Sequence, residues 1–138
     1  LSSVQNIVCI APTEPDHGSD PSAIETTATE EGDFWKINGG KMWISNGSFA
    51  DFALVFAQTD PSKGYKGIVS LIVAKGTPGY SATAIHGKLG IRSSNTAELI
   101  FDNVSIPKSQ QLGEIGQGFS IARKKMRLLA ATNVLHGL

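Results

Sequence analysis

The chain has 138 residues, and its 12 Lys and Arg balance its 12 Asp and Glu to a formal net charge of zero. A neutral chain has no overall field that attracts nucleic acid or an acidic membrane surface, so we expect no nucleic-acid partner. Hydrophobic residues make up 41% of the sequence and charged residues 17%, a balance that excludes a disordered or collagen-like chain.

The single cysteine, Cys9, excludes an internal disulfide and a zinc ribbon, which indicates a reducing compartment. No apolar run approaches the roughly 20 residues of a membrane span, and the first residues lack the basic start of a secretory signal. We therefore expect a soluble intracellular protein without a membrane span. Because the chain starts without Met and ends inside a predicted helix, we also expect it to be a piece of a longer protein.

The elements predicted in chain order are mainly strands. A short apolar strand ends at Ala11-Pro12, and Asn38-Gly39-Gly40 between two apolar runs predicts a β-hairpin. The strands predicted after Thr26 are Phe34 to Ile37, Lys41 to Ser45, Phe52 to Gln58, Ile68 to Ala74, Tyr80 to Ile85 and Ala97 to Phe101. The turns between them are predicted at Asp60-Pro61, Lys66-Gly67, Thr77-Pro78-Gly79 and Asp102-Asn103.

This spacing predicts a mainly β fold, an antiparallel β-barrel or sandwich. After Gly118 the period changes, because Phe119, Ala122, Met126 and Leu129 follow at helical spacing, so one α-helix is predicted there. Charge is uneven along the chain, and we interpret both charged segments as solvated faces. The acidic segment contains Glu14, Asp16, Asp20, Glu25, Glu30, Glu31 and Asp33, and the basic one contains Arg123, Lys124, Lys125 and Arg127.

Metal and nucleophile chemistry find little support in the sequence. The three histidines, His17, His86 and His136, are far apart, and no metal-ligand or nucleophile motif is present, so we predict no metal site and no catalytic residue. We expect His17 to be an exposed turn residue rather than a base. Cys9 lies in an apolar run and is expected to be a buried, inert thiol.

Two segments could bind a ligand. In Thr13 to Asp20, hydroxyls and backbone N–H groups could converge on an anionic or carbonyl-rich ligand, although an ordinary turn explains the same composition. In Lys41 to Gly47, alternation places Trp43 and Ser45 on one face, about 7 Å apart by the strand rise. A flat heteroaromatic ligand could stack on the indole and bond to the hydroxyl, or the pair could be a core Trp beside a satisfied Ser.

Taken in order, these motifs closely resemble the middle domain of the acyl-CoA dehydrogenase family, with short-chain, butyryl-type members most similar. The resemblance is carried by Thr13-Glu14-Pro15, Gly18-Ser19-Asp20, Ile37 to Gly47, Gly76 to Gly79, Lys88 to Leu99, Val104 to Pro107 and Leu112 to Phe119. It implies a middle β-barrel domain at residues 1–115 and the first helix of a truncated C-terminal helical domain at 116–138.

The resemblance also implies a site for FAD. Its cofactor-binding residues would be Ile10, Ala11, Pro12, Thr13, Gly18, Ser19, Trp43, Ile44 and Ser45. Ser19 would also contact the substrate near the CoA thioester arm. Trp43 would pack against the isoalloxazine, Ser45 would hydrogen-bond at N5 and Thr13 would reach the pyrimidine edge.

The activity implied is α,β-dehydrogenation of acyl-CoA thioesters, in which a glutamate removes the α-proton and hydride passes to flavin N5. Electrons would leave through an electron-transferring flavoprotein, and the full-length enzyme would be a homodimer or homotetramer of the mitochondrial matrix or the bacterial cytoplasm. A flavin oxidase or monooxygenase of the same superfamily, and a non-catalytic β-barrel binding module, remain alternatives.

Two departures from the family pattern matter. Pro12 has no N–H to offer a flavin oxygen. The family stretch that contacts the CoA nucleotide would fall on Met126 to Ala130 and is missing, and Leu129 stands where some members place the catalytic glutamate. We therefore expect the base to lie outside the chain and the isolated chain to be inactive.

Overall fold

A computed structural model describes residues 6–20 and 22–124 of the chain. Its strands are β1 (Val8–Ala11), β2 (Thr27–Glu31), β3 (Phe34–Ser45), β4 (Phe52–Gln58), β5 (Ile68–Ala74), β6 (Tyr80–Ala84) and β7 (Thr96–Pro107). Two 3-10 helices, η1 (Pro61–Gly67) and η2 (Lys108–Gln110), and a helical segment at 118–124 are also described. The mainly β prediction is confirmed, and the rest of the predicted helix, with Met126 and Leu129, lies outside the described residues.

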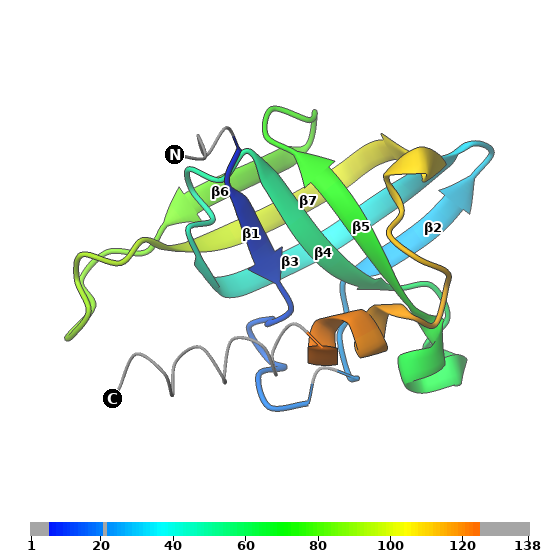
Figure 1. The fold of residues 1–138 in the computed structure, drawn as a ribbon, viewed down its shortest axis with the longest axis horizontal. Helices are drawn as coiled ribbons and strands as arrows, with labels where there is room; N and C mark the ends of the chain where they lie inside the picture. The colour runs from blue at the N-terminus through cyan, green and yellow to red at the C-terminus, as the bar shows by residue number, and fades with distance from the viewer. Residues whose placement is uncertain (1–5, 21, 125–138) are drawn as a thin grey trace, which may run out of the picture.

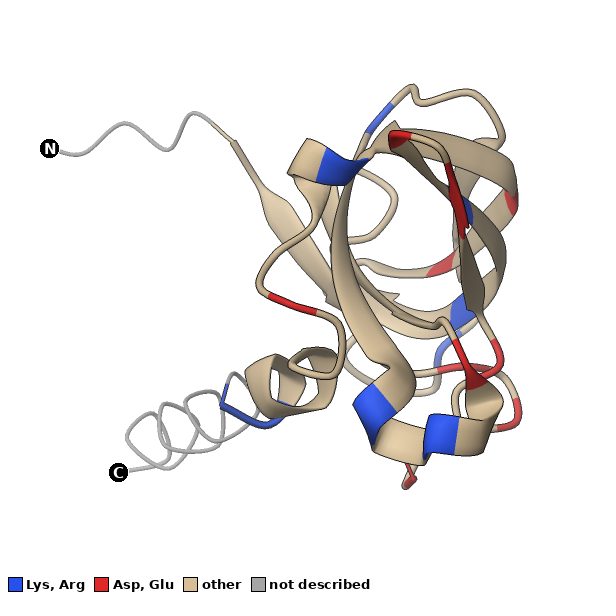
Figure 2. Ribbon diagram, turned by 90° about the vertical axis from the view of Figure 1, so that its right-hand side faces the viewer, with Lys and Arg blue, Asp and Glu red and all other residues tan. Residues whose placement is uncertain are grey.

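The strands form one sheet that curls around its own interior (Figures 1 and 2). Its order is β1-β4-β2-β3-β7-β6, and β5 adds to β4. The β2–β3, β3–β7, β6–β7 and β4–β5 pairs are antiparallel, as predicted. The β1–β4 pair and the single Thr27–Gln58 pairing are parallel, and in both cases a long connection separates the paired strands in the sequence. The sheet is therefore mixed rather than wholly antiparallel.

The hairpin predicted at Asn38-Gly39-Gly40 is wrong, because β3 runs without a break through these residues. The turn that joins β2 to β3 lies at Gly32 and Asp33. Gly39 meets a different need. Its φ is 140°, and a Cβ there would lie 2.7 Å from the Cα of Thr26, so only glycine permits this close approach of two backbones.

The break predicted at Asp102-Asn103 is also wrong, because β7 continues through it. The register between β3 and β7 shifts there, and Asn103 has a φ of 53°, a conformation that Asn tolerates better than most side chains. Its backbone N–H donates to Asn38 Oδ1 at 2.8 Å. These turn-forming residues therefore make a bulge that bends a long strand instead of ending it.

Apolar side chains gather in two clusters on the two faces of β4 and β5. The larger fills the interior of the curl and includes Trp35, Ile37, Ile44, Val55, Val69, Leu71, Leu99, Phe101 and Ile106. In the smaller, Phe56 and Ile68 of the outer face pack against Phe119 and Ala122 of the 118–124 segment. Because both faces are covered, β4 is buried along almost its whole length.

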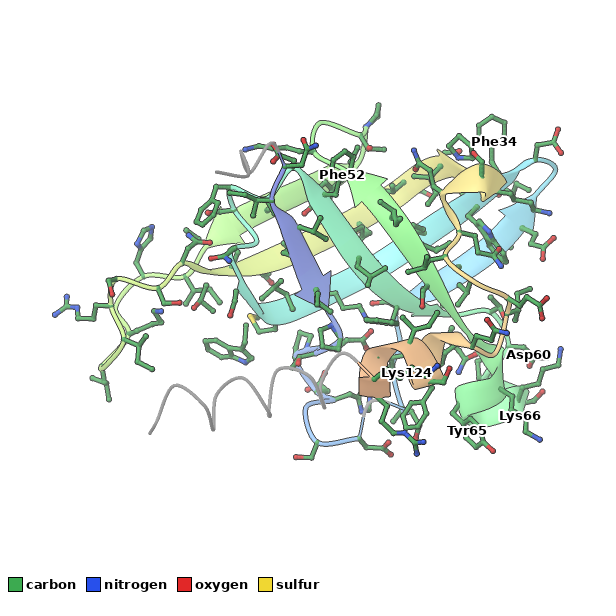
Figure 3. The ribbon with its side chains drawn as sticks, in the orientation of Figure 1. Phe34, Phe52, Asp60, Tyr65, Lys66 and Lys124 are labelled. Carbon is green, nitrogen blue, oxygen red and sulfur yellow. The ribbon has the colours of Figure 1, made fainter. Side chains whose placement is uncertain are left out.

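The η1 helix lies beside the 118–124 segment. The rings of Tyr65 and Phe119 pack with their centroids 5.7 Å apart, and Figure 3 shows Tyr65, Lys66 and Lys124 along the lower side of the molecule. Acidic and basic residues are interspersed over the described surface (Figure 2), which is consistent with solvated charges except at one buried pair.

Candidate functional site

The loop that follows β1 carries the first group of predicted ligand-binding residues. Thr13 is partly buried, while Gly18 and Ser19 are exposed. Reciprocal backbone hydrogen bonds between Glu14 and His17, at 3.1 and 3.3 Å, close the turn between them. The turn therefore has a defined shape and presents Ser19 to solvent.

The end of β3 carries the second group. Trp43 is 59% exposed, and it flanks the buried Ile44 together with the exposed Ser45, so the indole and the hydroxyl lie outside the core. The strand is not regular here. The β3–β7 register shifts between Lys41 and Ile44, and Trp43 has a φ of 63°. A bulge therefore sets the direction of the indole, and the 7 Å spacing of a regular strand does not apply.

A backbone hydrogen bond joins the two groups, which are far apart in the sequence. The N–H of Met42, next to Trp43, donates to the carbonyl oxygen of Thr13 at 2.9 Å. The loop that follows β1 therefore meets the bulge near the C-terminal end of β3.

A buried ion pair lies directly behind this junction. Lys41 Nζ donates to Glu14 Oε1 at 2.7 Å, and the two side chains are 0% and 4% exposed. The Glu14 carboxylate also accepts from the backbone N–H groups of Thr26 at 2.9 Å and Glu25 at 2.6 Å. Our expectation that the acidic segment is solvated is therefore wrong for Glu14, because three donors hold its carboxylate inside the protein.

These contacts set the charges of the pair. Burial disfavours the Glu14 carboxylate, but the Lys41 ammonium and the hydrogen bonds from Lys41, Thr26 and Glu25 outweigh it, so the pKa of Glu14 lies below its ordinary value. Burial lowers the pKa of Lys41 to about 8, and the neighbouring carboxylate opposes this shift. At neutral pH the site contains a charged, desolvated pair.

The remaining predicted residues support the site from behind. Ala11 and Ile44 are 0% and 2% exposed and belong to the larger core cluster. Ile10 packs on the smaller cluster, and Pro12 faces Phe56 there in a small cavity that Phe119 also lines. Of the predicted site residues, Gly18, Ser19, Trp43 and Ser45 are exposed, whereas Ile10, Pro12 and Thr13 are partly buried.

Cys9 occupies the position expected for it, whereas His17 lies in a turn but is less exposed than expected. His17 is partly exposed, and its Nε2 lies 3.1 Å from Glu25 Oε1, a hydrogen bond that raises the pKa of the histidine. Cys9 is buried, and burial raises the pKa of its thiol to about 11, so the nucleophilic thiolate is scarce at neutral pH. The prediction of a buried thiol is confirmed.

Sequence reasoning missed Glu14 and Lys41 as supports of the site. A signal was present, because Lys41 occupies a core-facing position of a strand whose other inward residues, Trp35, Ile37 and Ile44, are apolar. A lysine at such a position needs a buried counter-charge, but its partner cannot be chosen from seven nearby acids by spacing alone.

Fold and site together define a class of protein: a curled β-domain with an exposed aromatic ring and a hydroxyl-bearing loop that meet near the C-terminal end of one long strand. The family model described as acyl-CoA dehydrogenase, middle domain, matches residues 9–104. The short-chain specific acyl-CoA dehydrogenase of Rattus norvegicus mitochondria is 49% identical over 120 residues, which are 87% of this chain and 29% of that enzyme.

Two solved structures extend the comparison. The butyryl-CoA dehydrogenase of Megasphaera elsdenii matches with a TM-score of 0.82 and 43% identity, over 85% of this chain and 31% of that one. A glutaryl-CoA dehydrogenase of Mycobacterium smegmatis in complex with FADH2 matches with a TM-score of 0.72 and 48% identity, over 77% of this chain and 26% of that one.

The chain therefore belongs to the acyl-CoA dehydrogenase family, and the resemblance inferred from its motifs is confirmed. It spans about a third of the length of the relatives that it matches. Within residues 6–20 and 22–124, no three His, Cys, Asp or Glu side chains gather into a metal-binding group. No helix in the described part of the chain is long and apolar enough to cross a membrane.

Proposed function

We propose that the chain is the middle domain of an FAD-dependent acyl-CoA dehydrogenase and provides the surface on which flavin and thioester meet. The observation that carries the proposal is the junction of the Thr13–Ser19 loop with the Trp43 bulge, made by the hydrogen bond from Met42 to Thr13, in a chain whose residues 9–104 match this family. We propose residues 1–115 as the β-domain and 116–138 as the start of the helical domain that follows it.

The residues at this junction fit a flavin. Trp43 offers a flat indole face, for which an aromatic ring system is the matching partner. Ser45 can donate a hydrogen bond at N5, Thr13 can reach the pyrimidine edge, and Ser19 can bind the pyrophosphate region and the thioester arm. Pro12 has no backbone N–H to donate to a flavin, and it lines a small cavity together with Phe56 and Phe119.

The chemistry that a bound flavin would supply is to accept the β-hydride of the thioester. The domain's own part is to hold the flavin and the thioester carbonyl in register, and the buried side chains behind the platform make that surface rigid. We infer that the base that removes the α-proton is a glutamate outside this chain, because Leu129 occupies one family position for it. That position lies outside the described residues.

The wider setting of the enzyme follows from the same proposal. The 49% identity to a short-chain specific enzyme supports a short acyl-CoA as the substrate class. We propose an electron-transferring flavoprotein as electron acceptor, a homodimer or homotetramer as the assembly, and the mitochondrial matrix or the bacterial cytoplasm as the compartment.

Anaerobic reduction tests the activity. Butyryl-CoA added to the full-length protein should bleach the flavin absorption band, and the reduced flavin should persist when oxygen is admitted. Rapid reoxidation with release of hydrogen peroxide would instead assign the protein to the oxidase or monooxygenase branch. A full-length protein that binds no FAD would contradict both the dehydrogenase and the oxidase or monooxygenase assignments. It would favour the alternative of a non-catalytic binding module.

Single substitutions test the site assignment. In the full-length protein, Trp43→Ala and Ser45→Ala should each weaken FAD binding or slow flavin reduction by about tenfold or more, because each removes a direct contact. His17→Ala is the matched control, since its ring is engaged with Glu25. Equal losses in all three variants would contradict the assignment.

A further inference from the structure

The buried pair Glu14–Lys41 joins two backbone segments at the edge of the proposed flavin platform. Glu14 directly follows Thr13, and Lys41 lies two residues before Trp43. The 2.7 Å contact between their side chains lies beside the 2.9 Å backbone bond from Met42 to Thr13. The loop and the bulge are thus connected twice, once through the backbone and once through buried charges.

Burying this ion pair costs desolvation free energy. Two desolvated charges stabilise a fold little more than well-packed apolar side chains of the same volume would. Unlike apolar contacts, the interactions of such a pair depend on direction. A carboxylate that accepts from three donors is held in a single favourable geometry. The buried charges therefore contribute a fixed geometry between the two segments rather than additional stability.

The backbone at the bulge needs such a fixed point. Trp43 adopts a φ of 63°, which a bulky side chain disfavours, and its indole is 59% exposed. Lys41, by contrast, is fully buried just before it. A side chain anchored in the interior two residues before the strained position limits how far the bulge can relax.

We propose that the Glu14–Lys41 ion pair is a positioning element that fixes Trp43 relative to Thr13 and thereby sets the geometry of the flavin platform. This inference rests on the proposed function for its ligand. The pair touches neither substrate nor cofactor and acts through the two residues that it places.

The test uses variants of the full-length protein that separate position from folding. Glu14→Gln leaves Lys41 without its counter-charge, whereas the double variant Glu14→Gln/Lys41→Met removes both charges at similar volume and should recover part of the stability that the single variant loses. The recovery is partial because an amide has one acceptor oxygen, whereas both carboxylate oxygens accept from the backbone N–H groups of Glu25 and Thr26. The matched control is Glu31→Gln, which breaks an ion pair with Lys36 at 3.3 Å that joins β2 to β3 near their turn and is solvent-exposed.

Two measurements are made on each variant. The 19F NMR resonance of 5-fluorotryptophan at position 43, assigned by its loss in Trp43→Phe, reports the indole environment in the absence of any cofactor. Fluorescence titration reports FAD affinity. We expect the double variant to shift or broaden the Trp43 resonance, to leave that of Trp35 in place and to bind FAD about tenfold more weakly, while Glu31→Gln matches wild type in both.

A folded double variant with a wild-type Trp43 resonance and wild-type FAD affinity would overturn the inference. Equal changes in the Trp35 and Trp43 resonances would also overturn it, because they would show a general loss of packing. If Glu14→Gln alone does not fold, the Trp43 resonance and FAD affinity of the double variant still test the inference. If wild-type protein binds no FAD, the proposed function fails, but the cofactor-free resonance still tests the positioning role.

Discussion

Trp43 combines two unfavourable features in a single residue. Its left-handed backbone costs about 1 kcal/mol or more for a side chain of this size, and its exposed indole forgoes about 2 kcal/mol of apolar burial. Neither feature helps the fold, because Ile44 beside it already fills the core position. Backbone strain and exposed apolar surface are typical of binding sites, where contacts with a ligand compensate for them. Both features therefore support a role for this indole in binding.

The buried carboxylate of Glu14 should make stability depend on acid pH. Because the folded protein holds the pKa of Glu14 below its ordinary 4.5, the unfolded chain binds more protons as the pH falls, so this contribution is full above that value and is lost below it. Urea unfolding of wild type and Glu14→Gln should therefore differ most near pH 7, with a gap that narrows below about pH 4.5. A gap that stays constant with pH would contradict this assignment.

The close approach at Gly39 should make it intolerant of any side chain. Gly39→Ala places a Cβ 2.7 Å from the Thr26 Cα at a φ of 140°, so we expect a loss of about 3 kcal/mol in the free energy of unfolding. Gly32→Ala is the matched control, because its φ is 59° and the space around its Cβ is open, so it should cost about 1 kcal/mol. If urea denaturation gave equal losses in the free energy of unfolding for the two variants, the contact with Thr26 would contribute nothing beyond backbone strain.

At the scale of elements, β4 and β5 could be predicted to the residue because each is an apolar run bounded by turn residues. The long strands β3 and β7 could not, since Asn38-Gly39 and Asp102-Asn103 have the composition of turns. Whether such residues reverse a strand or only bend it depends on the partner strand, and here each pair faces the other. That the residues of the platform bind a flavin stays a prediction, and the bulge at Trp43 could not be predicted, because local alternation does not encode it.

The connection between β6 and β7 is an element with its own internal brace. Lys88 Nζ donates to the carbonyl oxygens of Ser94 at 2.6 Å and Ile91 at 3.0 Å and to Thr96 Oγ1 at 3.0 Å. Lys88→Met should therefore raise amide hydrogen exchange across residues 85–95 by about tenfold, whereas the exposed Lys66→Met should not. Unchanged exchange in Lys88→Met would mean that the connection holds its shape without the brace.

At the scale of the whole molecule, one apolar cluster lies inside the curl and another lies under the 118–124 segment. Trp43 belongs to neither cluster and is 59% exposed, so we expect the rest of a flavin enclosure to come from outside these residues. We expect the 138 residues alone to hold FAD weakly and to show no flavin bleaching with butyryl-CoA. Thioester-dependent bleaching by this chain in an anaerobic cuvette would contradict that expectation and place a base within it.

The parallel pairing of β1 with β4 also bears on the order in which the domain is built. About 40 residues separate Ala11 from Phe52, so the pairing of β1 with β4 closes a long loop and requires a strand that is made well after β1. The loop that carries Thr13 and Ser19 begins directly after Ala11, whose partner in β4 is Val55. On a nascent chain this end of the loop therefore has no strand to pair with until β4 has been synthesised.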